Sequence, residues 1–190
     1  MVLASWHNHS MSGRSHFELT VPIDATDHVL GELHAPVSVV EYGDFECPNC
    51  KQAAPAVKLL LERFAGRVLF AFRHFPLEEV HPHALLAAEV SEVAAAQGKF
   101  WPMYDALFEH QLHLKAANLR GYAEGLQLDM ARYSAELDDH IYLQRIREHV
   151  QSGRSSGVRG TPTFFVNRAI QDVSFGMHLL FDAVETALKR

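Results

Sequence analysis

The stretch Val37-Ser38-Val39-Val40-Glu41-Tyr42-Gly43-Asp44-Phe45-Glu46-Cys47-Pro48-Asn49-Cys50 decides the fold of this chain. Its first half is an apolar run typical of a buried β-strand, and its second half ends in a cysteine pair at the start of a helical pattern. These are the only two cysteines in the 190 residues. A disulfide that closes so small a loop constrains the unfolded chain little, so the pair is expected to serve chemistry rather than stability.

Length and composition fit one globular domain, with room for an insertion. The net charge is -6 and no long basic run occurs, which argues against nucleic acid as a partner. No apolar stretch approaches the ~18 residues of a membrane span. No signal peptide is visible at the start, which favours a cytoplasmic location. If a signal has been removed, a periplasmic or exported location is expected instead.

The hydrophobic pattern divides the chain into three parts. Residues 1–16 are rich in Ser, His and Asn, lack periodicity and are expected to form a flexible arm. A β-rich part follows, then a stretch with helical patterns only, then a second β-rich part. Strands are predicted at 17–23, 37–43, 68–73, 163–166 and 169–175, and helices at 48–64, 84–97, 101–113, 115–125, 129 onward, 138–151 and 177–189.

Several motifs together resemble the DsbA-like branch of the thioredoxin superfamily, from about residue 21 to residue 188. They are Glu41, the Cys-Pro-Asn-Cys pair, Pro55, Phe75-Pro76-Leu77, Gln97-Gly98-Lys99-Phe100-Trp101 and the segment from Gly157 to Thr163. The resemblance implies an α/β protein, a thioredoxin fold with an inserted all-helical domain. The thioredoxin-like domain would comprise residues 17–77 and 157–190, and the helical insertion residues 78–156.

The cysteine pair is expected to form a redox-active disulfide, Cys47-Cys50. Cys47 precedes the predicted helix, so free N–H groups and the positive end of the helix dipole should stabilise its thiolate. We therefore expect Cys47 to attack and the more buried Cys50 to resolve the mixed disulfide. Pro48 suits the first helical turn. The alternative is half of a zinc site, but no second Cys-x-x-Cys completes one, so no metal is expected.

The residues beside Cys47 should tune its thiolate. Strongly oxidising relatives commonly carry His at the position of Asn49, and Asn cannot carry charge. Glu46 would raise the thiol pKa and Lys51 would lower it, unless both face solvent. The expected result is a Cys47 pKa that is depressed, but less than in a strong oxidant.

The resemblance also implies roles for three residues outside the pair. Glu41 would exchange protons with Cys50; the alternative is a structural ion pair. A cis Thr161-Pro162 bond would face the cysteines and present backbone groups to an extended substrate; the alternative is an ordinary trans proline.

The remaining candidates are histidines and aromatic residues. His7, His9 and His16 could bind a metal ion, but a mobile tail is favoured. His81 and His83 are interpreted as helix-entry residues rather than ligands. Trp101, Phe108 and Leu112 are interpreted as the core of the insertion.

The sequence thus predicts a thiol–disulfide oxidoreductase that needs no cofactor and exchanges disulfides with protein substrates and an unidentified redox partner. Whether it oxidises, reduces or isomerises is left open. The alternatives are a peptide-binding or chaperone-like module whose thiols are incidental, and a glutathione-linked relative of the same fold.

Overall fold

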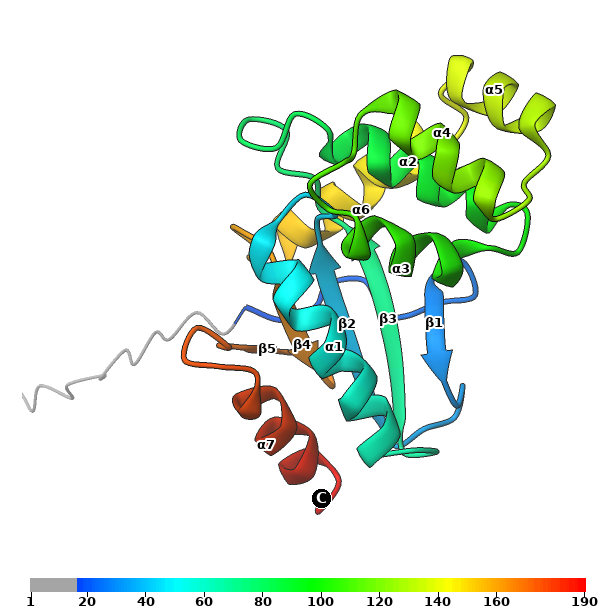
Figure 1. Cartoon of the computed structure of the whole chain (residues 1–190). Helices are drawn as coiled ribbons and strands as arrows, with labels where there is room; N and C mark the ends of the chain where they lie inside the picture. The colour runs from blue at the N-terminus through cyan, green and yellow to red at the C-terminus, as the bar shows by residue number, and fades with distance from the viewer. Residues whose placement is uncertain (1–16) are drawn as a thin grey trace, which may run out of the picture.

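A computed structural model describes residues 17–190. The predicted arm, with His7, His9 and His16, lies outside the described residues. A five-stranded sheet has the order β1-β3-β2-β4-β5 (Figure 1). β2 and β3 are parallel, and the other neighbours are antiparallel. The strands are β1 (His28–Gly31), β2 (Val37–Gly43), β3 (Val68–His74), β4 (Thr163–Val166) and β5 (Ala169–Gln171).

Helices cover both faces of the sheet, and the alternation along β2 decides which side chains meet them. Val37 and Val39 belong to the larger core with α1 (Pro48–Arg63), whereas Val40 and Tyr42 belong to the smaller core on the other side. Figure 1 shows α1 crossing the front of the sheet and α6 (Leu143–Ser155) behind it. Glu41 lies two residues after Val39 on β2, so its side chain points to the same face of the sheet, which α1 covers.

Five helices lie between β3 and β4 along the chain. All of them except α6 pack mainly on one another and gather at one end of the sheet, whereas α6 packs against β3 (Figure 1). The Asp129 side chain accepts hydrogen bonds from two backbone N–H groups and caps α5. The helices are α2 (Ala84–Ala95), α3 (Phe100–Glu109), α4 (Ala116–Gly125), α5 (Met130–Asp138) and α6, and α7 (His178–Ala187) closes the chain after β5.

The prediction of a strand at 17–23 is wrong. The segment makes one isolated bridge, between Glu18 and Ala169, and then leaves the sheet. Side chains bind its backbone groups instead: the buried guanidinium of Arg73 donates hydrogen bonds to the carbonyls of Val21 and Pro22. The first strand is β1, in a stretch that the sequence assigns to a loop, and it pairs with β3.

Two smaller predictions also fail. The strand expected at 169–175 ends at Gln171, and Phe175 beyond it is exposed. Leu112 is 88% exposed and belongs to no core, since it follows the end of α3 rather than lying inside it. Phe108 is buried as predicted, and Trp101 is partly buried and packed against the same core.

Candidate active site

Three segments meet at the cysteine pair: the end of β2, the start of α1 and the loop before β4. The antiparallel pairing of β2 with β4, from Val39–Val166 to Tyr42–Thr163, brings the loop beside the helix. Cys47 is the N-cap of α1, and Pro48 is its first residue. The Thr161–Pro162 peptide bond is cis. The Cys47 thiol donates a hydrogen bond to the carbonyl of Thr161 at 3.2 Å, across 114 residues of sequence.

Both cysteines are free thiols, and the fold treats them differently. Cys47 is 4% exposed, whereas Cys50 is completely buried. A hydrogen bond from the Cys50 side chain is the largest cause that lowers the pKa of Cys47, to about 5. The backbone N–H groups of Asn49 and Cys50 lower it further, and burial opposes them. The Thr161 carbonyl also opposes them, because it accepts a hydrogen bond only from the protonated thiol.

Cys50 and Glu41 lie deeper, where burial favours their neutral forms. Burial first, and then the hydrogen bond to Cys47 and the charge of Glu41, raise the pKa of Cys50. Burial, followed by the charge of Cys47, raises the pKa of Glu41 to about 8. Neither carboxylate oxygen of Glu41 has a hydrogen-bond partner within residues 17–190, so the structure offers no ion pair for it. Glu41 is therefore a buried acid that can take or give a proton near neutral pH.

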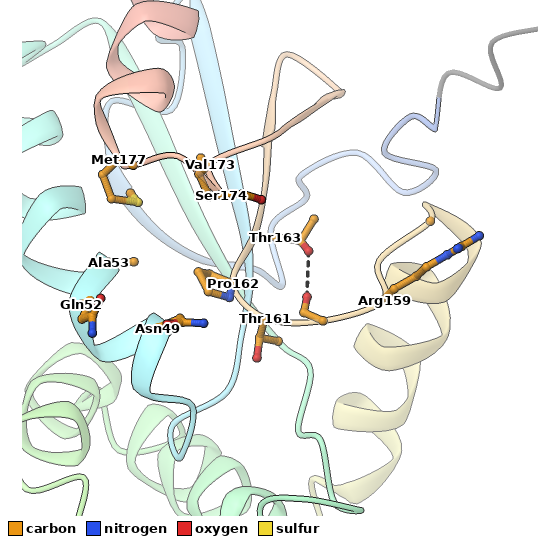
Figure 2. Close-up of a pocket in the computed structure, with 13 residues that line it drawn as sticks. Asn49, Gln52, Ala53, Arg159, Thr161, Pro162, Thr163, Val173, Ser174 and Met177 are labelled. Carbon is orange, nitrogen blue, oxygen red and sulfur yellow. Dashed lines mark hydrogen bonds between the residues drawn. The ribbon is translucent and has the colours of Figure 1, made fainter.

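A groove of about 670 Å³ opens beside the cis proline (Figure 2). One wall comes from the first turns of α1, including Asn49, and the other from the loop that carries Arg159, Thr161 and Pro162. Asn49 and Pro162 lie across from each other, with Val173, Ser174 and Met177 above them in the view. Of the candidate residues of the sequence, Asn49, Thr161 and Pro162 line this groove. Cys47 adjoins it through its hydrogen bond to Thr161, and Pro48, Cys50 and Glu41 lie around Cys47 rather than in the groove lining.

The charged neighbours of Cys47 turn away from it. The Glu46 carboxylate accepts hydrogen bonds from the backbone N–H and the Nδ1 of His83, at 2.6 and 2.9 Å. Lys51 is exposed and its Nζ donates to the carbonyl of Glu109. His83 immediately precedes α2, as its interpretation as a helix-entry residue predicts.

Sequence reasoning missed two residues that hold the loop before the cysteines. The buried Gln111 donates from Nε2 to the carbonyls of Phe45 and Cys47, both at 2.9 Å. The buried Asp44 binds His81 at 2.7 Å. No pattern along the sequence points to either, because each partner lies far away in the chain.

A second polar cluster lies away from the cysteines, where His28, His74 and Glu92 place their ligand atoms within 4.8 Å of one another. Both imidazoles bind the same Oε1 of Glu92, at 2.8 Å each. Arg145 donates to that oxygen too, at 3.0 Å. A guanidinium therefore already neutralises the carboxylate and would repel a metal ion, so hydrogen bonding accounts for the cluster.

Residues 24–186 match the family model described as thioredoxin. The chain belongs to this thioredoxin family. Curated relatives include a protein named Na(+)/H(+) antiporter NhaA 1 from Salinispora arenicola, 49% identical over 171 residues, or 90% of this chain. The chain spans only 26% of the length of that relative. Within residues 17–190, none of the helices has the length and apolar character needed to cross a membrane.

Solved structures of several proteins share the fold. A thioredoxin-like oxidoreductase from Silicibacter pomeroyi is 26% identical with a TM-score of 0.78, over 88% of this chain and 95% of that one. Oxidised BdbD from Bacillus subtilis is 24% identical with a TM-score of 0.78, over 86% and 94%. The thiol-disulfide exchange protein alpha-DsbA2 from Wolbachia pipientis is 19% identical with a TM-score of 0.73, over 86% and 88%. The fold class and the DsbA-like resemblance are thereby confirmed.

Proposed function

We propose that this chain is a thiol–disulfide oxidoreductase that exchanges disulfides with protein substrates through Cys47 and Cys50. The observation that carries the proposal is the contrast between the two thiols. Cys47 lies at the helix N-terminus with a pKa of about 5, so it is largely a thiolate at neutral pH. Cys50 is buried beside it with a raised pKa. A nucleophile and a protonated resolving thiol are the two parts that disulfide exchange needs.

In the reducing direction, the Cys47 thiolate attacks one sulfur of a substrate disulfide, and the other sulfur leaves as a thiolate and takes a proton. Cys50 then loses its proton to Glu41 and attacks the Cys47 sulfur. This step forms the Cys47–Cys50 disulfide and releases the second substrate thiolate, so the substrate gains two electrons and the protein loses them. In the oxidising direction the steps reverse, and Glu41 returns the proton to Cys50.

We propose that the groove beside Pro162 holds an extended substrate segment, with the backbone of Thr161 available for pairing. The reaction needs neither a metal nor an organic cofactor in this scheme. The redox partner is a second dithiol or disulfide carrier of unknown identity. Because the antiporter relatives are about four times longer than the matched segment, we assign the thiol chemistry to this chain and not ion exchange.

The Cys47 pKa supports an intermediate redox character. A value of about 5 lies between about 7 for thioredoxin and about 3.5 for DsbA. A stabilised thiolate favours the reduced form and so makes the disulfide more oxidising. We expect a reduction potential between about -270 and about -120 mV. Neither the fold nor the relatives support a cytoplasmic location. We propose the exported alternative, because disulfides form and persist in oxidising compartments.

An insulin-reduction assay tests the function. Cys47→Ala should abolish turnover. Cys50→Ala should retain the first attack and accumulate mixed disulfides that non-reducing electrophoresis separates. If the chain is a peptide-binding module with incidental thiols, both variants should behave like the wild-type protein in this assay. That result would overturn the proposal.

A further inference from the structure

Asp44 connects the loop before the cysteines to a segment far along the chain. Asp44 is 2% exposed as a residue, and its buried carboxylate accepts three hydrogen bonds. Oδ1 accepts from the backbone N–H of Glu46 at 2.7 Å. Oδ2 accepts from the backbone N–H of Leu77 at 2.8 Å and from Nδ1 of His81 at 2.7 Å. A carboxylate with three donors at these distances has one orientation, so the peptide unit of Asp44 is fixed as well.

That peptide unit contacts the resolving thiol. The backbone N–H of Asp44 donates to the Sγ of Cys50 at 3.5 Å. Among the causes that set the Cys50 pKa, this bond acts against burial and against the charges of Glu41 and Cys47. A hydrogen bond to the sulfur favours the thiolate, which is the form that attacks. Any group that fixes the Asp44 peptide therefore bears on the second step of disulfide exchange.

His81 is the one side chain among these three donors, and the other two are backbone N–H groups that substitution leaves in place. It lies 37 residues after Asp44, in the turn that precedes α2. Its imidazole is partly buried, with 17% of the side chain exposed. Of the two histidines on this turn, only His81 reaches the residue whose backbone binds Cys50, since His83 binds Glu46 instead.

We propose that His81, acting through Asp44, is a positioning residue for the attack of Cys50 on the Cys47 sulfur of a mixed disulfide. The inference rests on the proposed thiol exchange and adds a residue outside the cysteine motif to it. His81 touches neither cysteine and is not itself catalytic. Its removal leaves the Oδ2 of Asp44 with one donor fewer and frees the loop to rotate the N–H away from Cys50.

Stopped-flow reaction of the reduced protein with one equivalent of dithiobis(nitrobenzoate) separates the two steps. Cys47 attacks the reagent and releases a first thionitrobenzoate anion. Cys50 then attacks the Cys47 sulfur and releases a second. His81→Ala should leave the first release unchanged and slow the second by about tenfold, which corresponds to about 1.4 kcal/mol of activation free energy. His81→Asn, whose amide can donate from the place of Nδ1, should restore most of the rate.

The matched control is His83→Ala, which removes a carboxylate–imidazole pair from the same turn and leaves all three hydrogen-bond donors of Asp44 in place. It should leave both releases unchanged. His34→Ala, at an exposed histidine elsewhere, controls for loss of an imidazole. An unchanged second release in His81→Ala, or an equal slowing in His83→Ala, would overturn the inference. A wild-type protein that gives no second release would overturn the proposed function itself.

Discussion

Replacing Glu41 by Gln should stabilise the folded protein at alkaline pH. Glu41 is completely buried, and neither of its oxygens has a partner within the described residues. A buried carboxylate without donors destabilises the fold when it ionises, whereas a neutral carboxamide of the same shape does not. The expected gain is therefore absent in acid and grows as the pH rises.

The magnitude follows from the difference between the folded and unfolded states. Above pH 4.5 the unfolded chain releases the Glu41 proton, and the folded protein retains it up to a pKa of about 8. The folded state then binds more protons, so its stability falls as the pH rises through this range. The Glu41 pKa is 4.5 in the unfolded chain and about 8 in the folded protein. At about 1.4 kcal/mol per pKa unit, this difference corresponds to a loss of about 5 kcal/mol in folding free energy once Glu41 is ionised in both states.

Cys47 has the opposite effect and must be removed from the comparison. Folding lowers its pKa from 9.0 to about 5, so its thiolate adds stability as the pH rises between these values. The free energy of unfolding in urea is therefore compared between Cys47→Ala and Cys47→Ala/Glu41→Gln, from pH 4.5 to pH 9. The difference between these two variants reports Glu41 alone, whose pKa stays raised without Cys47 because burial is its main cause. The double variant should gain at least about 2 kcal/mol over the single one at the alkaline end. A difference that does not change with pH would refute the reasoning.

Three further outcomes test the site. Iodoacetamide alkylation of Cys47, assigned by mass spectrometry, should rise with pH through about 5 and be level at neutral pH, whereas a midpoint near 9.0 would contradict the lowered pKa. Asn49→His should raise the reduction potential measured against glutathione, because an imidazolium beside the thiolate stabilises the reduced form. Gly43→Ala should lower the free energy of unfolding by about 1–3 kcal/mol, since a Cβ there would lie 2.3 Å from the Phe72 ring and 3.2 Å from Oε1 of Glu41. Its control is Gly121→Ala on α4, where a Cβ meets nothing within 4 Å and improved helix propensity should add up to about 1 kcal/mol.

The parts of the fold that follow from local pattern could be predicted from the sequence. Buried strands such as β2 and β3 are continuous apolar runs. β1 could not be found this way, because it is four residues long and partly exposed, and only its pairing with β3 makes it a strand. The segment at 17–23 is the opposite case. Its pattern is typical of a strand, but two of its carbonyl groups accept hydrogen bonds from the buried guanidinium of Arg73 rather than from a neighbouring strand.

The candidate site divides in the same way. Cys47 and Cys50 are visible in the sequence as neighbours, and the resemblance adds Glu41 and Thr161-Pro162. Gln111 and the link from Asp44 to His81 depend on side chains that approach across 37 to 66 residues of sequence. Hydrogen bonds of this kind leave no periodic signal, so they emerge only when the chain is folded.

The pairing of β2 with β4 has a consequence for synthesis of the chain. Cys47 leaves the ribosome 114 residues before the Thr161 that completes its surroundings. Until then the thiol has only the neighbours of its own helix start, such as Asn49 and Cys50, and the loop that faces it is absent. The groove beside Pro162 is absent as well, because one of its walls belongs to that loop. We therefore expect the chain to bind its substrates only after the helices between β3 and β4 have been made and the loop has joined the sheet.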